Sequence, residues 1–367
     1  MNWMIYGATG FTGRIAVREA VAQGLEPVIA GRNEAKLAAI AGQHGLRHVS
    51  FPIDSSESIA KHLRGNEIQL VLNLAGPYAY TGAPMIRACL EAGCHYLDIT
   101  GEPNVFHDAY SMHEQALQKG VAIMPGVGFD ILPSDCMIKY VVDQISEATD
   151  VVMAFDFRGE TLSRGALKRG LEMVAANGNL IRRGGELIPI PFASESRMVH
   201  FLKGEAKAKL CMWGDVISGY RTTGAPNIAT FFAFDRPIER QFALLHRLRP
   251  LLRFGFVRKF LSKQLEREPE GPSKELQNTA RVDLYAKASD NQGRTAEVWL
   301  QTCEGYLFTA RACIYAAKRV LNENLAGALT PSIAFGRDSV LEIEGTIRRD
   351  SIAANTPATN PESSRLQ

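Results

Sequence analysis

The chain has 367 residues, 46% of them hydrophobic and 22% charged, which indicates a globular protein large enough for two domains. Its net charge of +2 gives no sign of the basic character of nucleic-acid-binding proteins, so we expect no nucleic-acid partner. No apolar run is long enough to span a membrane, and the chain opens on a strand rather than a signal peptide, which predicts a cytoplasmic protein.

The six cysteines form no C-x-x-C pair and show no spacing typical of a zinc site. We therefore expect buried thiols in a reducing compartment, and no bound metal.

The stretch from Trp3 to Arg14 predicts a strand, a glycine-rich loop and a helix. Gly7 would permit the tight turn, Gly10 the approach of a pyrophosphate and Gly13 the close packing of helix on sheet. Free N–H groups at the helix start favour a phosphate anion. The pattern predicts a dinucleotide site, and a merely structural glycine turn is the alternative.

The second strand, 27–30, ends in Gly31, Arg32 and Asn33. An arginine at this position accommodates the 2′-phosphate of NADP, whereas an acidic residue would bind the ribose hydroxyl of NAD. Arg32 therefore predicts NADP, with Asn33 and Lys36 assisting. Alternatively, Asn33 is only the N-cap of the next helix and Arg32 is solvated.

The third and fourth strands are expected at 47–54 and 70–75. Asp54 either meets the adenine amino group or caps the helix that follows. Ligands of open α/β sheets bind beyond the carboxyl ends of the strands, so Gly76, Pro77 and Tyr78 should pass beside the nicotinamide ribose.

The fifth and sixth strands, 95–100 and 121–124, supply the remaining candidates for chemistry. Reduction by hydride also needs a proton donor, and Tyr78, Glu102 and Asp130 all stand near strand ends. Two of them have an alternative role: Tyr78 as an aromatic wall of the cofactor pocket, and Glu102 as the cap of the next helix. Asp98, inside the fifth strand, is as readily a buried structural carboxylate.

Strands and helices alternate six times, which predicts a doubly wound parallel sheet in a Rossmann domain at 1–147. A second, α+β domain is expected at 148–325, then a C-terminal return segment at 326–349 and a disordered tail at 350–367. The second domain should contain strands at 151–157, 211–219, 228–235, 280–289 and 297–302, and a helix from 305 to 321.

Two polar groups in the second domain could hold a carboxylate or phosphate of the substrate. The first is a basic group of Arg164, Lys168 and Arg169, and the second is a polar loop that contains Arg221, Thr222, Thr223 and Asn227. A solvated surface is the alternative for both.

Residues 247–267 contain seven basic residues and one acidic residue, interleaved with large apolar side chains. Such a stretch can lie on an anionic membrane or contact an acidic partner such as an acyl carrier protein. The alternative is a lid or a dimer helix with a solvated cationic face.

The sequence resembles the saccharopine-dehydrogenase-like NADP-dependent reductases, a family that includes trans-acting enoyl reductases. The resemblance extends over about residues 3–345 and rests on the matching stretches 7–13, 30–33, 74–78, 95–102, 125–135, 221–227 and 330–336. It implies cofactor contacts at Thr9, Phe11, Thr12 and Ala75, and an α+β domain whose sheet builds a homodimer. Ala166 departs from the family's usual threonine, which puts a substrate role there in doubt.

These observations together predict an NADP(H)-dependent oxidoreductase that transfers hydride to or from a C=C, C=N or C=O bond of a small or carrier-bound substrate. One alternative is a trans-acting enoyl reductase of a polyketide or lipid pathway. The other is a non-catalytic NADP-binding adaptor.

Overall fold

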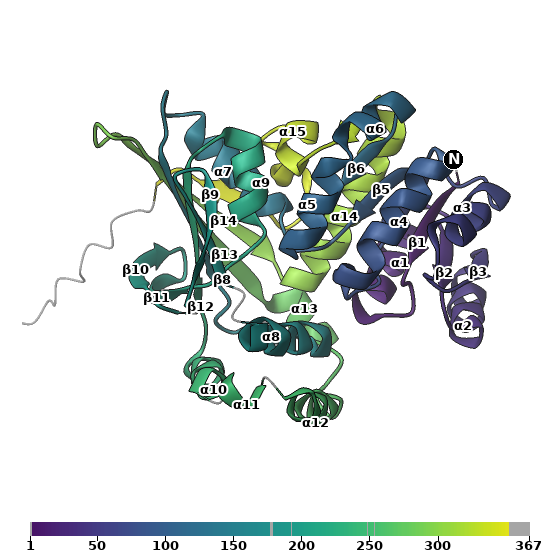
Figure 1. Cartoon of the computed structure of the whole chain (residues 1–367), viewed down its shortest axis with the longest axis horizontal. Helices are drawn as coiled ribbons and strands as arrows, with labels where there is room; N and C mark the ends of the chain where they lie inside the picture. The colour runs from purple at the N-terminus through teal and green to yellow at the C-terminus, as the bar shows by residue number, and fades with distance from the viewer. Residues whose placement is uncertain (1, 177–178, 192, 248, 253, 352–367) are drawn as a thin grey trace, which may run out of the picture.

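The computed structural model describes residues 2–176, 179–191, 193–247, 249–252 and 254–351. Two sheets lie side by side along the long axis of the molecule, each with helices packed against it (Figure 1). A seven-stranded parallel sheet and a second, mixed sheet confirm the predicted fold class.

The first sheet has the strand order β15-β6-β5-β4-β1-β2-β3, and every pair in it is parallel. Its strands are β1 (Trp3–Tyr6), β2 (Val28–Gly31), β3 (His48–Ser50), β4 (Leu70–Asn73), β5 (His95–Asp98), β6 (Ala122–Met124) and β15 (Gly327–Ala328). The central strands are buried on both faces, which explains their continuous apolar runs.

Helices cover both faces of this sheet, as the alternation of side chains along a strand requires. Ile5 and Leu72 pack with the helices α1 and α14, whereas Met4 and Val71 pack with α3 and α4. The helices are α1 (Phe11–Ala22), α2 (Glu34–His44), α3 (Ser56–Gly65), α4 (Tyr78–Ala92), α5 (Pro103–Ser111), α6 (His113–Lys119) and α14 (Gly305–Asn322).

The position of α14 differs from the expected division of the chain. We placed this helix in the second domain, but its buried residues Cys313, Ile314 and Ala317 belong to the core of the first sheet. Small side chains let it lie close to α1, and β15 then returns the chain to the edge of the same sheet. The domain boundaries stay predictions.

The second sheet has the order β10-β11-β12-β7-β13-β14-β16, with β8 paired to β12 and β9 paired to β8. All pairs are antiparallel except β12 with β7. The strands are β7 (Asp150–Asp156), β8 (Asn179–Arg183), β9 (Glu186–Ile190), β10 (Ser196–Phe201), β11 (Gly204–Leu210), β12 (Asn227–Ala233), β13 (Arg281–Ser289), β14 (Thr295–Cys303) and β16 (Ile347–Arg349).

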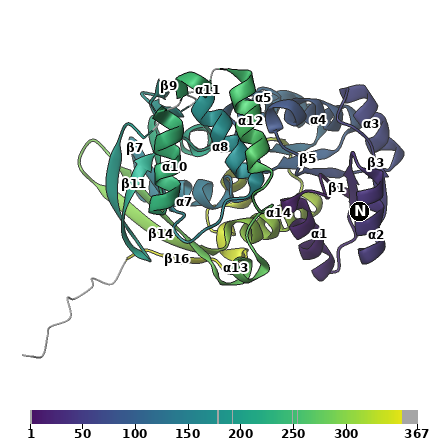
Figure 2. The ribbon, with the colours of Figure 1, turned by 90° about the horizontal axis from the view of Figure 1, so that it is seen from below.

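Helices cover this sheet on one face and extend below it. Figure 2 shows α10, α11 and α12 lying over α8 when the molecule is seen from below. The helices are α7 (Leu132–Val142), α8 (Arg164–Ala176), α9 (Asp215–Thr223), α10 (Arg236–Arg247), α11 (Arg249–Leu252), α12 (Gly255–Leu265), α13 (Lys274–Thr279) and α15 (Pro331–Phe335). No helix in the described ranges is both long and apolar enough to cross a bilayer.

The prediction of a strand at 211–219 is wrong. The strand β11 ends at Leu210, and α9 begins at Asp215. The run is buried almost throughout, so its apolar residues carry no period that separates strand from helix. Gly214 is the N-cap of α9, and a Cβ there would lie 2.8 Å from both Ile131 and Phe106, so close packing requires glycine at this position.

Two further predictions concern the cysteines and the C-terminal tail. All six cysteines are buried free thiols, as expected. Of the predicted disordered tail, residues 352–367 lie outside the described part of the chain, so that prediction is untested.

Candidate functional site

The glycine loop between β1 and α1 has the geometry of a phosphate cradle. Gly7 has φ +89°, and a Cβ on it would lie 2.8 Å from the backbone nitrogen of Ala75. A Cβ on Gly13 would lie 2.2 Å from the Gly7 carbonyl oxygen. Among the described residues no side chain caps the start of α1, which leaves its first-turn N–H groups for an anion. These features fit a dinucleotide pyrophosphate.

The residues predicted for the 2′-phosphate follow β2 directly. Arg32 is exposed, and no hydrogen bond or ion pair occupies its guanidinium within the described residues. The Asn33 side chain accepts the Lys36 N–H at 3.0 Å, so the predicted N-cap of α2 is confirmed. Asp54 is exposed and accepts the N–H of Ser55, which itself caps α3. These placements leave the predicted cofactor roles of Arg32, Lys36 and Asp54 open.

A segment from the second half of the chain lies against the glycine loop. Glu270 forms an ion pair with Arg14 in the first turns of α1, and Arg14 also donates to the Thr9 carbonyl. A Cβ on Gly271 would lie 2.5 Å from the ring of Phe11, so this backbone packs directly on that ring. Tyr306, at the start of α14, makes an edge contact with the Phe11 ring. Residues from the second half of the chain thus pack against the start of α1, next to the glycine loop.

The end of β4 and the start of α4 bring Tyr78 and Glu102 together. The Glu102 carboxylate accepts the N–H groups of Tyr78 at 3.0 Å and Ala79 at 2.7 Å, so it caps the preceding helix rather than the next one. Tyr78 is buried, and its hydroxyl donates to the Asn73 carbonyl at 3.3 Å. Burial raises the pKa of that hydroxyl well above its usual value, and the nearby Asp98 adds to the rise. Both observations favour Tyr78 as a wall of the cofactor pocket over Tyr78 as a proton donor.

Asp130 and Arg169 form an ion pair at the site. Asp130 follows β6, and its Oδ2 lies 2.9 Å from Nη1 of Arg169, which comes from α8, the helix that follows β7 of the second sheet. A Cβ on Gly101 would lie 2.6 Å from both groups, so the backbone beside Glu102 abuts the pair. Burial raises the pKa of Asp130, and the Arg169 guanidinium opposes that rise. The pair joins the carboxyl edge of the first sheet to a helix of the part of the chain that builds the second sheet.

Beneath this edge lies a buried polar network centred on Asp98. Its carboxylate is 0% exposed and accepts from the Tyr96 hydroxyl and from the N–H groups of Thr100 and Gly126, at 2.7–2.9 Å. Burial is the main cause that raises the pKa of Asp98 to about 6. The network ties the ends of β5 and β6 together, which confirms the structural alternative for this residue.

The predicted substrate residues are dispersed. Arg164 donates to the Glu268 carbonyl, and Lys168 pairs with Glu266 at 3.4 Å. Both therefore fix the segment that leads to Glu270 and Gly271 at the start of α1. Arg221 donates to the Ala328 carbonyl and stacks on Tyr110. The Thr223 hydroxyl donates to the Gly219 carbonyl one turn earlier, and the Asn227 side chain accepts the N–H of the distant Gly184. Only Arg169 of the basic group reaches the predicted proton-donor residues.

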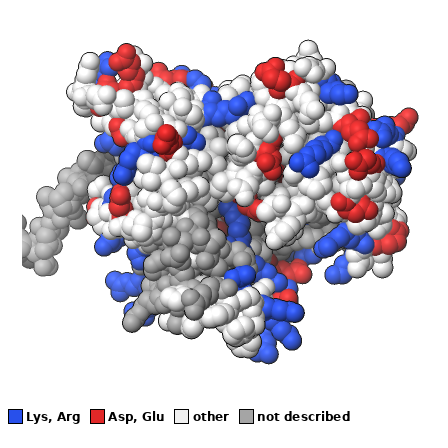
Figure 3. Space-filling model, viewed as in Figure 1, with Lys and Arg blue, Asp and Glu red and all other residues white. Residues whose placement is uncertain are grey.

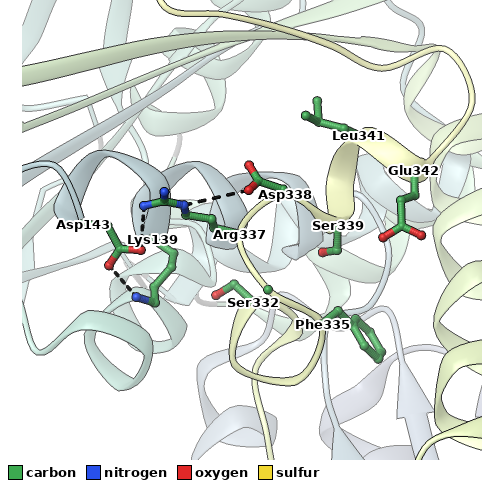
Figure 4. Close-up of a pocket in the computed structure, with 10 residues that line it drawn as sticks. Lys139, Asp143, Ser332, Phe335, Arg337, Asp338, Ser339, Leu341 and Glu342 are labelled. Carbon is green, nitrogen blue, oxygen red and sulfur yellow. Dashed lines mark hydrogen bonds and ion pairs between the residues drawn. The ribbon is translucent and has the colours of Figure 1, made fainter.

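A cavity of about 680 Å³ lies elsewhere, between α7 and the segment 332–342 (Figure 4). Figure 4 shows Lys139 and Arg337 both directed at Asp143, whose carboxylate pairs with each of them. None of the predicted site residues lines this cavity. Because its cations are already paired, the cavity offers an anionic ligand little free charge.

Sequence reasoning missed the role of Arg169, although it named the residue. Its partner Asp130 is 39 positions earlier, and the two meet because α8 packs against the end of the first sheet. The stacking of Arg169 on Trp213 at 5.3 Å was equally beyond any local pattern. The one signal in the sequence was the basic group itself.

Residues 3–124 match the family model of the saccharopine dehydrogenase NADP binding domain. A human saccharopine dehydrogenase-like oxidoreductase is 29% identical over 214 residues, which cover 51% of this chain and 50% of the relative. A trans-acting enoyl reductase of Mycobacterium bovis is 32% identical over 138 residues, 36% of this chain and 33% of the relative. The chain therefore spans about half the length, or less, of the curated relatives it matches.

Among solved structures, apo saccharopine dehydrogenase (L-Glu forming) from Saccharomyces cerevisiae matches with a TM-score of 0.60. The match covers 93% of this chain and 96% of the yeast protein at 11% identity, and so it shows a shared fold. The comparisons confirm the predicted family resemblance and NADP as the cofactor. The similar proteins are oxidoreductases, the class predicted for this chain.

Proposed function

We propose that this protein is an NADP(H)-dependent oxidoreductase acting where Asp130 and Arg169 meet, because residues 3–124 match the saccharopine dehydrogenase NADP binding domain and the pair lies at the end of the same sheet. The reaction is hydride transfer to or from a C=C, C=N or C=O bond. The substrate is small or carrier-bound, and the second sheet builds a homodimer. The observation that carries the proposal is the Asp130–Arg169 pair at the carboxyl edge of the parallel sheet.

The first half of the chain holds the cofactor. Gly7, Gly10 and Gly13 shape the cradle, the start of α1 binds the pyrophosphate, and Arg32 binds the 2′-phosphate. Bound NADPH supplies the hydride, and NADP⁺ accepts it. Gly76 and the buried Tyr78 form the wall beside the nicotinamide.

Asp130, Arg169 and Glu102 orient the substrate and control the transfer of the proton. Asp130 holds a proton more readily than an exposed carboxyl because burial raises its pKa. Arg169 offsets only part of that rise, and it presents a fork of N–H donors to a carboxylate or polarised oxygen of the substrate. Glu102 keeps the start of α4 in place through two backbone hydrogen bonds. Asp130 therefore moves the proton, and Arg169 positions the group that is reduced.

The test separates cofactor binding from turnover. NADPH affinity is measured by fluorescence, and transfer of deuterium from labelled NADPH to an enoyl thioester, an imine or a ketone is followed by mass spectrometry. Asp130→Asn should keep NADPH affinity and lose roughly 10²–10⁴-fold in transfer rate, the usual contribution of a general acid. Asp143→Asn is the matched control, because Asp143 also pairs with an arginine but lines the separate cavity.

Two results would overturn the proposal. One is NADPH binding with no transfer to any of the three substrate classes, which would favour the non-catalytic adaptor. The other is an equal loss of rate in Asp130→Asn and Asp143→Asn, which would show that the effect is not local to the Asp130–Arg169 pair. Transfer to the enoyl thioester alone, and only on a carrier, would select the trans-acting enoyl reductase.

A further inference from the structure

We propose that the outer face of α12, formed by Phe256, Lys259, Phe260 and Lys263, docks the protein onto an anionic lipid bilayer. Residues 3, 4 and 7 positions apart lie on the same side of a helix, so these four side chains form one strip. The proposal goes beyond the oxidoreductase function and does not depend on it.

The two phenylalanines are far more exposed than a globular protein requires. Phe256 is 74% exposed and Phe260 is 61% exposed. Leu251 and Phe254, just before α12, are also exposed, and the rings of Phe254 and Phe256 lie 5.8 Å apart. Single exposed apolar residues are common, but a cluster of this kind marks an interaction surface.

The opposite side of α12 accounts for the stability of the helix. Val257, Leu261 and Leu265 pack against Leu171 and Val174 of α8, together with Leu252. Arg258 lies on the inner side and donates to the Leu252 carbonyl at 2.7 Å. The outer phenylalanines are thus not needed to hold the helix in place.

The positive charge of the α12 surface indicates an anionic partner. From residue 247 to 265 the sequence contains no aspartate or glutamate. Lys259 and Lys263 are exposed, and no acidic side chain pairs with them among the described residues. Lysines and arginines gather at the lower edge of the molecule in Figure 3, where Figure 1 places α12. Phenylalanine rings next to unpaired lysine ammonium groups complement an anionic bilayer, because its headgroups are negative and the layer just beneath them is apolar.

The shape of the strip favours a bilayer over a protein partner. α12 has 11 residues, which makes it about 16 Å long, and α10 to α12 form the lowest layer of the molecule. A stable protein interface buries about 800 Å² on each partner, more than one short convex strip provides. An interfacial helix needs only to insert its apolar side chains among lipid headgroups.

The first experiment is flotation of the full chain with vesicles of phosphatidylglycerol and phosphatidylcholine, compared with phosphatidylcholine alone. Wild type should float with the anionic vesicles only, and less so as salt rises, because exposed charges are screened over about 10 Å at 0.1 M. Phe260→Ser with Lys263→Glu should weaken partition at least about tenfold, since each cation near an anionic surface contributes about 1 kcal/mol, or fivefold, and the ring adds to this.

The matched control is Leu117→Ser with Lys119→Glu on α6, at the opposite side of the molecule in Figure 1. Leu117 is 43% exposed, so this variant removes one exposed apolar group and reverses one lysine, as the test variant does. It should float like wild type. Circular dichroism of both variants checks that they fold.

A second readout reports insertion directly. Phe256→Trp places an indole in the strip, whereas the native Trp3 and Trp299 are buried and Trp213 is partly buried. Its emission should shift to the blue with anionic vesicles and be quenched by brominated lipid tails.

Each outcome decides the proposal. Loss of flotation in the α12 variant alone, with the blue shift, supports it. No flotation of wild type, equal loss in the α6 control, binding to an acidic carrier protein but not to vesicles, or self-association through α12 would each overturn it. Vesicle binding needs no turnover, so failure here and failure of the proposed reaction are distinguishable.

Discussion

The two halves of the candidate site are built in different ways. The phosphate-binding part of the cofactor half is one stretch of the chain, from Gly7 of the first loop to Arg32 and Asn33. The substrate half joins Glu102, Asp130 and Arg169 from three separate segments. A contiguous stretch carries its geometry in its own backbone, whereas dispersed residues depend on how two sheets pack.

The difference extends to what each half tolerates. In the glycine loop, backbone atoms occupy the space where a side chain would be, so the fit is steric. Around Asp130 the fit is electrostatic, between a mostly buried carboxyl and a guanidinium. We therefore expect a substitution in the glycine loop to abolish cofactor binding, and a substitution around Asp130 to reduce activity in a graded way.

Gly13→Ala should have the largest effect. Its Cβ would lie 2.2 Å from the Gly7 carbonyl oxygen and 2.9 Å from the Ala8 Cα, and neither backbone atom can move without opening the loop. We expect a loss of roughly 4 kcal/mol in the free energy of unfolding and no measurable NADPH binding. Urea unfolding and fluorescence titration measure both.

Gly42→Ala provides the control for that change. Gly42 is in α2, and no atom lies within 4 Å of the place that a Cβ would take, so alanine should stabilise the protein by about 0.5–1 kcal/mol. If both glycine variants were equally stable, the steric account of the cradle would be wrong.

Asp98→Asn tests the support beneath the substrate half. The pKa of Asp98 is raised to about 6, above that of an unfolded chain, so the folded state binds the extra proton. This carboxyl thus stabilises the fold most below about pH 4, and its contribution falls as the pH rises to about 6, by about 3 kcal/mol. The asparagine variant should lack this dependence.

The measurement is urea unfolding of both proteins across this pH range. Asparagine can still accept the N–H groups of Thr100 and Gly126 through its single oxygen, and the Tyr96 hydroxyl can accept from its amide. A constant difference between wild type and variant at every pH would contradict the raised pKa.

Arg32→Ala should have a moderate effect limited to one cofactor. A charge-assisted hydrogen bond to the 2′-phosphate contributes roughly 1.5–3 kcal/mol, so NADPH affinity should fall by that amount while NADH affinity stays the same. Arg47→Ala is the matched control, because Arg47 is exposed but precedes β3 at the amino end of the strands. Equal losses for both cofactors would argue against Arg32 as the selector of NADP.

The same contrast explains what could be predicted from the sequence. The glycine loop, the Asn33 cap and the parallel strands follow from local spacing and apolar runs, and all of them appear in the fold. The strand expected at 211–219 failed because a fully buried run has no period. The partner of Arg169, and the helix that Glu102 caps, depend on contacts between distant segments, which no local pattern encodes.

Tyr78→Phe should have the smallest effect. It decides whether Tyr78, which lines the cofactor part of the site, also donates the proton. The Tyr78 hydroxyl is directed at the Asn73 carbonyl, and burial raises its pKa well above the usual value, so it is a poor proton donor. Removing it deletes one hydrogen bond, and we expect a loss of about 1 kcal/mol in stability and less than about tenfold in the rate of deuterium transfer. A fall of roughly 10²–10⁴-fold with unchanged NADPH affinity would instead make Tyr78 the donor and reduce Asp130 to a positioning residue. Combining Tyr78→Phe with Asp130→Asn separates these cases, because two residues with independent roles lose rate additively in free energy, whereas two members of one proton path do not.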